Sequence, residues 1–508
     1  MSKICVCLTA KTIARNLDIL EQYRKSADMA ELRVDCLDPD ERLLIRRFPE
    51  LAGLPSILTI RRKIDGGRFI SGEGSRASLM ARGLAYADID RRKNFAYIDL
   101  EEDLRVPSIE EAARSFGTRV IRSYHNFKGD DEDLAAKMRA MTHAGDEILK
   151  VAVMANSTWD ALALLRAGRE HKGREKVLVA MGEKGIFSRI LAKRFGSLWS
   201  YALPSELMDA DGARLGIMDP AVLARDYRFR QIGADTKIYG AAGFPLRAAH
   251  LCGFFNAVFE MESMDAVYAP FPADSIVACM ELARELGLLG LSVFSPYKES
   301  VIPLLDEQSP DVEKIGACSA LERMESPEGA TMWRGHNFEG LAFRESISEF
   351  LGWRSLRRTR ATVIGSGSAA KAVAAELYRA GAKALILDGA VRKARALALP
   401  YRFAWGSLDE VAKIEEYRDI IIRAVSDGAE DRDFFDSAER HAFTGQEIVM
   451  DLACRPETTA FLKRASEAGC KVLGGRDALA RQARLQYACF TGREFPEYAA
   501  PKIQMEWD

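Results

Sequence analysis

Short apolar runs alternate with amphipathic stretches along the first 220 or so residues of the chain. Eight of these runs have the length and β-rich composition of buried strands. They lie at residues 3–9, 30–35, 56–61, 95–101, 119–125, 147–153, 177–182 and 197–203. Helix-like segments such as 14–27 and 158–171 connect them. Eight β–α units of this total length predict a (β/α)8 TIM barrel, and a doubly wound open sheet is the competing arrangement.

The barrel prediction places the candidate chemistry at one end of the strands. Catalytic groups of such barrels lie at the carboxyl ends of the strands. Polar or charged side chains interrupt the apolar pattern at or just after these ends: Glu31, Arg33, Arg61, Glu101, His125, Lys150 and Arg189. One of them alone is explained as a solvated strand end. So many on one rim indicate an active site.

Lys150 lies inside the apolar run 147–153. A lysine there either extends its amine to water at the rim or is desolvated. Desolvation lowers the pKa of an amine, and the neutral amine attacks a ketone to form an iminium. For the lysine alone, extension to water is the favoured interpretation, and it is the neighbouring residues that favour a neutral, nucleophilic Lys150.

The neighbours of Lys150 extend this interpretation. His125 follows the preceding strand and is suited to move a proton near neutral pH. Glu101 is expected to orient the imidazole, and Arg61 and Arg189 offer guanidinium groups for a carboxylate. The set suits elimination of water from a β-hydroxy ketone that carries an acid group, with no metal required.

The alternation of strand-like and helix-like segments changes near residue 228. Residues 224–240 predict a helix, a short linker and a new strand, after which βα units continue to about residue 340. A strand and glycine-rich turn at 361–371 then open a unit of nucleotide-binding character. We expect domains at 1–228, 235–340 and 341–508.

The composition narrows the class of partner. The 72 basic and 74 acidic residues nearly cancel, so a nucleic-acid partner is not expected and small molecules are. No signal-peptide pattern and no apolar run near the roughly 20 residues of a membrane span occur, which favours a cytoplasmic enzyme. The nine cysteines are scattered without a Cys-x-x-Cys pair, which favours reduced buried thiols over disulfides or zinc.

Residues 1–228 resemble type I 3-dehydroquinate dehydratase in the order and spacing of six segments. These are ELRVD (31–35), TIRR (59–62), DLE (99–101), SYHNF (123–127), LKVAVMA (149–155) and MGEKGIFSR (181–189). The resemblance implies that Lys150 forms a Schiff base with the C3 ketone of 3-dehydroquinate, without a cofactor. It implies that His125 is the general acid and base that yields 3-dehydroshikimate, with Glu101 in support. Substrate hydroxyls and carboxylate would be held by Glu31, Arg33, Arg61 and Arg189.

One loop departs from this family. The family closes a Ser-Ala-Pro-Gly-Gln loop over the substrate, whereas residues 208–219 read MDADGARLGIMD here. Ala213 and Ile217 occupy the positions nearest to the family's serine and glutamine. The resemblance therefore predicts altered lid closure and unaltered lysine chemistry.

From residue 235 to about 500 the chain resembles shikimate dehydrogenase, so the whole chain resembles the fused enzymes of plants and some bacteria. Lys298 in SPYKE and Glu339 in GHNFEG match the catalytic lysine and aspartate of that family. Asn337 and Gln482 match substrate contacts. The resemblance implies a substrate domain, a Rossmann-type domain whose last helices return to it, and reduction of 3-dehydroshikimate by NADP or NAD chemistry.

Several polar substrate contacts of that family are replaced. The paired serines fall at Ala249 and Leu251, a threonine falls at Phe294 and an asparagine at Ser319. A site built to bind hydroxyl groups loses discrimination when such partners become apolar.

The expected cofactor loop follows the strand at 361–364 and opens a helix. It consists of Gly365, Ser366, Gly367, Ser368 and Ala369. At the end of the next strand, Asp388 stands where the family's Asn-Arg-Thr begins. An aspartate there accepts from a ribose 2′-hydroxyl and repels a 2′-phosphate, which favours NAD. Alternatively, Asp388 only caps its loop.

Three interpretations of the second half follow. It reduces 3-dehydroshikimate; or it is inactive and serves as a structural or regulatory module beside an active dehydratase; or it is a dehydrogenase with another substrate or NAD preference. Lys298 and Gln482 favour an active site, whereas Ala249, Leu251 and Phe294 argue against shikimate in its usual pose.

Overall fold

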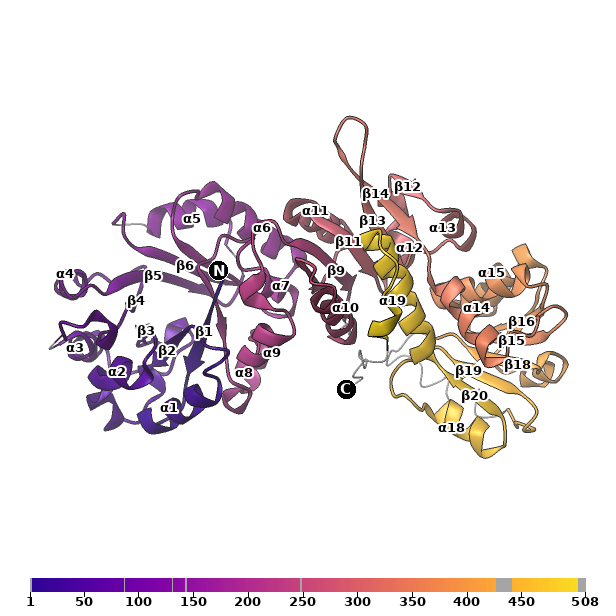
Figure 1. The fold of residues 1–508 in the computed structure, drawn as a ribbon, viewed down its shortest axis with the longest axis horizontal. Helices are drawn as coiled ribbons and strands as arrows, with labels where there is room; N and C mark the ends of the chain where they lie inside the picture. The colour runs from indigo at the N-terminus through magenta and orange to yellow at the C-terminus, as the bar shows by residue number, and fades with distance from the viewer. Residues whose placement is uncertain are drawn as a thin grey trace. The chain divides into compact units, whose positions relative to one another are not determined.

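The computed structural model describes residues 2–85, 87–129, 131–141, 144–246, 249–425 and 441–500 (Figure 1). The chain divides into two compact units. The first consists of Met1–Gly240, Pro245–Arg247 and Phe259–Gly287, and the second of Ala241–Phe244, Ala248–Val258 and Leu288–Asp508.

Eight parallel strands form the barrel of the first unit in the order β7-β6-β5-β4-β3-β2-β1-β8. They are β1 (Lys3–Leu8), β2 (Met29–Arg33), β3 (Ser56–Thr59), β4 (Tyr97–Glu101), β5 (Arg119–Asn126), β6 (Ile148–Met154), β7 (Lys176–Met181) and β8 (Trp199–Ala202). A bridge between Lys176 and Ser197 joins the remaining two strands and nearly closes the ring. The predicted TIM barrel is confirmed, and the open sheet is wrong.

Helices lie outside the strands (Figure 1). They are α1 (Ile13–Gln22), α2 (Phe48–Ala52), α3 (Glu73–Leu84), α4 (Pro107–Ser115), α5 (Leu134–Met141), α6 (Thr158–Glu170), α7 (Phe187–Ile190), α8 (Ala210–Arg214) and α9 (Pro220–Arg225). Local sequence sets their starts: Ser157 and Asp160 form a reciprocal capping box at the start of α6.

Period-two alternation decides which side chains face the barrel interior. On β6, Ile148, Ala152 and Met154 belong to the apolar cluster of the barrel core. Lys150 lies between them on the same face of the strand and therefore points inward. The same register brings Ser123 of β5 opposite Lys150.

The first unit also contains a segment that follows the barrel in sequence, with β10 (Ala266–Pro272) and α11 (Ile276–Leu286). The Phe187 and Phe271 rings stack with centroids 5.1 Å apart. Asp274 accepts hydrogen bonds from the backbone N–H and hydroxyl of Thr158, at 2.9 and 2.8 Å. Ring stacking and hydrogen bonds thus join this segment to the barrel.

The second unit begins with strands in the order β11-β13-β14-β12. They are β11 (Leu288–Val293), β12 (Glu307–Gln308), β13 (Ala320–Glu325) and β14 (Thr331–His336). Nearby helices include α12 (Tyr297–Ser300), α13 (Pro310–Ile315) and α14 (Glu339–Phe350), and helix α10 (Ala249–Met261) precedes them in sequence.

A second parallel sheet in this unit has the order β17-β16-β15-β18-β19-β20. Its strands are β15 (Arg360–Ile364), β16 (Lys383–Asp388), β17 (Ala404–Ser407), β18 (Ile420–Arg423), β19 (Ile448–Asp451) and β20 (Lys471–Gly474). Its helices include α15 (Ser368–Arg379), α16 (Val391–Ala398), α18 (Ala460–Glu467) and α19 (Gly475–Thr491). Numbered within this sheet, the order is 3-2-1-4-5-6, that of dinucleotide-binding domains. The predicted Rossmann-type domain is confirmed.

No helix in the described ranges is long and apolar enough to cross a bilayer. All nine cysteines lie in those ranges, and no disulfide joins any of them.

Candidate active site

Lys150 is buried inside the barrel and held by two carboxylates. Its Nζ is 2.9 Å from Asp99 Oδ2 and 3.4 Å from Glu31 Oε1, and it lies 4.3 Å from the centre of the Tyr201 ring. Burial alone lowers the pKa of Lys150, but the charges of Asp99 and Glu31 outweigh it and raise the pKa above the ordinary lysine value. The direction of this shift favours the ammonium form of Lys150 over the neutral amine that the sequence predicted.

Asp99 is the central acceptor of the site and was not singled out by sequence reasoning. Its carboxylate accepts from Arg61 at 2.9 Å and from the Ser123 hydroxyl at 2.6 Å, besides Lys150. Although burial opposes ionisation, Arg61 and Lys150 hold the pKa of Asp99 well below the usual range. The signal was present: Asp99 lies two residues before Glu101 on β4 and so shares its inward face.

His125 lies on β5 within the same electrostatic network. Burial, together with the positive charges of Arg61 and Lys150, holds the pKa of His125 well below the ordinary histidine value. Its Nδ1 has no hydrogen-bond partner among the described residues. The imidazole is therefore neutral at pH 7 and able to accept a proton.

Glu101 does not orient His125 in this structure. Its two carboxylate oxygens accept from Arg61 Nη1 at 2.9 Å and from Arg76 Nη1 at 2.5 Å. No hydrogen bond joins Glu101 to His125 within the described ranges. The predicted contact between Glu101 and His125 is thus not made. Glu101 instead accepts hydrogen bonds from two buried guanidinium groups. One of them belongs to Arg76 on α3, which sequence reasoning missed.

Glu31 and Arg33 lie together at the end of β2, but only Glu31 contacts Lys150. Glu31 also accepts from the Thr59 hydroxyl at 2.9 Å. Arg33 makes two hydrogen bonds of 2.9 Å to the carboxylate of Asp35, so part of its hydrogen-bonding capacity is already taken up within the protein.

Arg189 is a buried cation that forms no ion pair with any acidic side chain in the part of the chain that the structure describes. Its Nη2 donates to the backbone carbonyl of Leu215 at 3.0 Å, and its Nε has no partner among the described residues. Burial lowers the pKa of Arg189 to about 10, which leaves it charged at neutral pH. A buried guanidinium is costly without a compensating anion, so Arg189 has the character of an anion-binding group.

The segment after β8 packs on the barrel through apolar contacts. Leu215 and Ile217 lie against the apolar cluster of the barrel core, and the Leu215 carbonyl also accepts from the Gly182 N–H at 3.1 Å. Ala213 lies in the short helix α8. The structure thus places no polar side chain at the two positions where the resembling family has serine and glutamine.

The second candidate site contains Lys298 of α12 and Glu339 at the start of α14. Lys298 Nζ forms an ion pair with Glu339 Oε1, and Glu339 Oε2 has no hydrogen-bond partner among the described residues. Asn337 accepts from the Glu339 N–H at 3.0 Å and donates to the Ala317 carbonyl at 2.9 Å. The pair can therefore exchange a proton and accept from one further donor.

The other residues predicted for this site lie on several different elements. Gln482 lies on α19, and the Ser319 hydroxyl is used locally because it accepts from the Phe338 N–H at 2.9 Å. Leu251 is buried in α10 and Phe294 is half-buried. The side chain of Ala249 lies outside the described residues.

The loop between β15 and α15 fits a pyrophosphate. Gly365 has φ +112°, and a Cβ there would lie 2.6 Å from the Ala424 carbonyl oxygen, so only glycine fits. A Cβ on Gly367 would meet nothing within 4 Å, which leaves room beside the N-terminus of a 12-residue helix. The loop residues are Gly365, Ser366, Gly367, Ser368 and Ala369.

Asp388, at the end of β16, does cap its loop. It accepts from the Ser366 hydroxyl at 2.7 Å and from the Ala390 N–H at 2.8 Å. These bonds tie the glycine-rich loop to the neighbouring strand end, where the adenosine ribose binds in folds of this topology.

Comparison with known proteins matches both halves. A family model described as type I 3-dehydroquinase matches residues 4–233, and one described as shikimate dehydrogenase substrate binding domain matches residues 242–321. The chloroplastic bifunctional 3-dehydroquinate dehydratase/shikimate dehydrogenase of Arabidopsis thaliana is 26% identical over 527 residues, which cover 98% of this chain and 83% of that protein.

The second half also matches single-activity proteins. Shikimate dehydrogenase (NADP(+)) of Pyrococcus abyssi is 30% identical over 256 residues, which cover 50% of this chain and 92% of that protein. The crystal structure of shikimate dehydrogenase from Aquifex aeolicus is 27% identical, with a TM-score of 0.47, over 54% of this chain and 98% of that one.

Proposed function

We propose that this chain, which belongs to the shikimate dehydrogenase family in its second half and matches the type I 3-dehydroquinase family model over residues 4–233, catalyses two consecutive reactions. The barrel site dehydrates 3-dehydroquinate to 3-dehydroshikimate, and the second site reduces 3-dehydroshikimate to shikimate. The observation that carries the first assignment is the buried Lys150 amine, 2.9 Å from Asp99 and in one charge network with a neutral His125.

In the proposed dehydration, the Lys150 ammonium first transfers its proton to water, because only the neutral amine is a nucleophile. The amine adds to the ketone carbon, and loss of water gives an iminium. His125 then takes a proton from the adjacent carbon to form an enamine. Collapse of the enamine expels the β-hydroxyl, which leaves as water with the proton that His125 returns. Hydrolysis of the iminium restores Lys150.

The remaining barrel residues bind and position the substrate. Arg189 is the proposed carboxylate partner because its charge has no other in the described site. Glu31, Arg33 and Arg61 lie at the same strand ends and are the proposed contacts for substrate hydroxyls. Glu101 acts through Arg61, which it holds at 2.9 Å.

In the second site, Lys298 and Glu339 flank the oxygen of the carbonyl group being reduced, and Lys298 supplies the proton that this oxygen takes up. Asn337 and Gln482 are the proposed contacts for the remaining hydroxyls. Residues Gly365–Ala369 would hold a nicotinamide dinucleotide, which would supply hydride chemistry when bound. The Asp388 carboxylate repels a 2′-phosphate, so we propose that NADH serves better than NADPH, although the named archaeal relative is an NADP(+) enzyme.

Borohydride reduction in the presence of 3-dehydroquinate tests the first assignment. It should trap one adduct on Lys150, and Lys150→Met should abolish trapping and lower turnover by on the order of 10⁴-fold or more. Lys176→Met is the matched control, because Lys176 is a buried lysine on the next strand whose amine donates to the His171 carbonyl. Trapping that survives in Lys150→Met would refute the assignment.

The reductase assignment is tested by adding a nicotinamide nucleotide to the same reaction mixture. After the enone has formed, added NADH or NADPH should lose its absorbance, and Lys298→Met should stop this loss while leaving enone formation intact. Enone formation without oxidation of either nucleotide would refute the reductase assignment alone. Faster oxidation of NADPH than of NADH would refute the role given to Asp388.

A further inference from the structure

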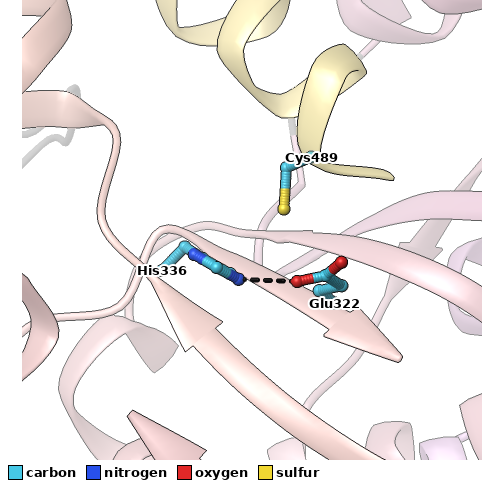
Figure 2. Close-up of side chains that lie close together, drawn as sticks. All are labelled: Glu322, His336 and Cys489. Atoms are coloured by element: carbon cyan, nitrogen blue, oxygen red, sulfur yellow. Dashed lines mark hydrogen bonds and ion pairs between the residues drawn. The ribbon is translucent and has the colours of Figure 1, made fainter. Parts of the chain in front are cut away.

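Three side chains with metal-binding atoms converge on one face of the β13–β14 pair. Glu322, His336 and Cys489 each place one ligand atom within 4.8 Å of the other two. His336 Nε2 and Glu322 Oε2 are 3.0 Å apart. Figure 2 shows the Cys489 thiol pointing from α19 toward this pair.

The strand register brings Glu322 and His336 together. Ala320 pairs with His336 and Glu322 pairs with Arg334 across the antiparallel ladder. Glu322 and His336 are therefore diagonal neighbours on the same face. Their side chains are 32% and 16% exposed, so an ion from solvent can reach them.

The position of Cys489 is fixed by the docking of α19. Gly290 of β11 lies opposite Glu322, and an added Cβ there would lie 2.4 Å from the Phe490 ring, so the helix approaches the strand closely. One turn earlier, Gln486 accepts from the Ser292 hydroxyl at 2.7 Å and donates to the Ser319 carbonyl at 3.1 Å. The thiol is thus held over the His–Glu pair before any ion arrives.

We propose that Glu322, His336 and Cys489 form a binding site for a zinc-type divalent cation, with a fourth position open to water. Carboxylate oxygen, imidazole nitrogen and thiolate sulfur are all zinc ligands, and three protein ligands plus water is a recurrent coordination. On binding, the Cys489 S–H bond breaks and its proton goes to solvent, so affinity rises with pH. Because the site joins α19 to β13 and β14, the cation also stabilises the second unit.

Cobalt(II) replaces zinc as a spectroscopic probe of the proposal. Titration of the metal-free full chain with Co²⁺ should give one equivalent of bound metal, tetrahedral d–d bands and a sulfur-to-cobalt charge-transfer band, all lost on addition of Zn²⁺. Zn²⁺ should also raise the midpoint of thermal unfolding. Absence of the sulfur band, or binding well above one equivalent without saturation, would overturn the proposal.

Two single variants assign the ligands. Cys489→Ser should abolish the sulfur band, and His336→Gln should keep the thiol but weaken Zn²⁺ binding by more than about 100-fold, beyond the loss expected for an outer-shell group. Cys454→Ser is the matched control, because Cys454 is a half-buried thiol elsewhere in the same unit. Circular dichroism of the metal-free variants separates ligand loss from misfolding. A sulfur band that persists in Cys489→Ser would also overturn the proposal.

Discussion

Asp99 receives hydrogen bonds from a lysine, an arginine and a serine at the centre of the barrel. Because Lys150 and Arg61 share this one carboxylate, the charge of Asp99 controls the protonation of the amine. Sequence reasoning located Lys150, His125 and most of the rim, since polar residues in apolar strands stand out. Sequence reasoning predicted a neutral Lys150, whereas the structure favours the ammonium. Burial and neighbouring carboxylates shift the pKa of a lysine in opposite directions, and the distances between the groups decide which effect is larger.

Replacing Asp99 by asparagine should shift the pH dependence of Lys150 reactivity. The carboxylate stabilises the ammonium and raises the pKa of Lys150, so its removal lowers that pKa and moves the alkaline rise of amine reactivity to lower pH. Reductive methylation of Lys150 as a function of pH, read by mass spectrometry, measures the shift. Asp103→Asn, at an exposed partner of Arg62, should leave the profile unchanged. A shift of the Asp99→Asn profile toward higher pH would contradict this account.

Replacing Arg189 by methionine should stabilise the protein and weaken catalysis. The buried cation has no acidic partner in the described site, so an apolar side chain of similar length should add about 1 kcal/mol to the free energy of unfolding. Loss of the carboxylate contact should lower kcat/KM for 3-dehydroquinate by about 100-fold or more. Arg194→Met, outside the site, is the kinetic control. An unchanged KM in Arg189→Met would remove Arg189 from substrate binding.

At the scale of elements, the barrel strands were predictable because each combines apolar alternation with a strand-like length. The Rossmann-type sheet was predictable from a glycine-rich turn between a strand and a helix. The resemblance implied that the last helices return to the substrate domain, but it did not predict the docking of α19 on β11 and β13. This docking depends on Gly290, Phe490 and Gln486 meeting across nearly two hundred residues, and no local pattern encodes which strand a helix covers.

Replacing Gly290 by alanine should therefore destabilise the second unit. The new Cβ would meet the Phe490 ring at 2.4 Å, and relief of that overlap should cost about 1–3 kcal/mol. Gly253→Ala is the matched control, because Gly253 is an exposed glycine in α10 with nothing within 4 Å of an added Cβ. It should instead stabilise by about 0.5–1 kcal/mol. Urea unfolding measures both, and equal effects would contradict the close packing of α19.

At the scale of the whole molecule, the first compact unit extends beyond the strands and helices of the barrel. Residues Phe259–Gly287 belong to the same compact unit. Arg166 and Arg169 on α6 pair with Glu281 and Glu285 on α11. The sequence suggested a boundary near residue 228 because the alternation of strand-like and helix-like segments changes there. Side-chain contacts between segments that are distant in sequence produce no pattern of this kind.

Replacing Asp274 by asparagine tests this extension of the unit. Hydrogen bonds from Lys184 and Thr158 outweigh the effect of burial and lower the pKa of Asp274 to about 2, from an ordinary value of 3.8. Its stabilising contribution is therefore complete above about pH 4 and is lost as the pH falls to about 2. The variant should unfold roughly 1–3 °C lower at pH 7, with the difference shrinking below pH 4. Asp18→Asn, at an exposed acid on α1, should show no such convergence.

The ion pair between Lys150 and its carboxylates also protects the resting enzyme from side reactions. A protonated amine has no lone pair to give, so a metabolic aldehyde that diffuses into the barrel finds no nucleophile and leaves unmodified. The charge on Lys150 therefore limits its reaction with carbonyl compounds until the proton is lost.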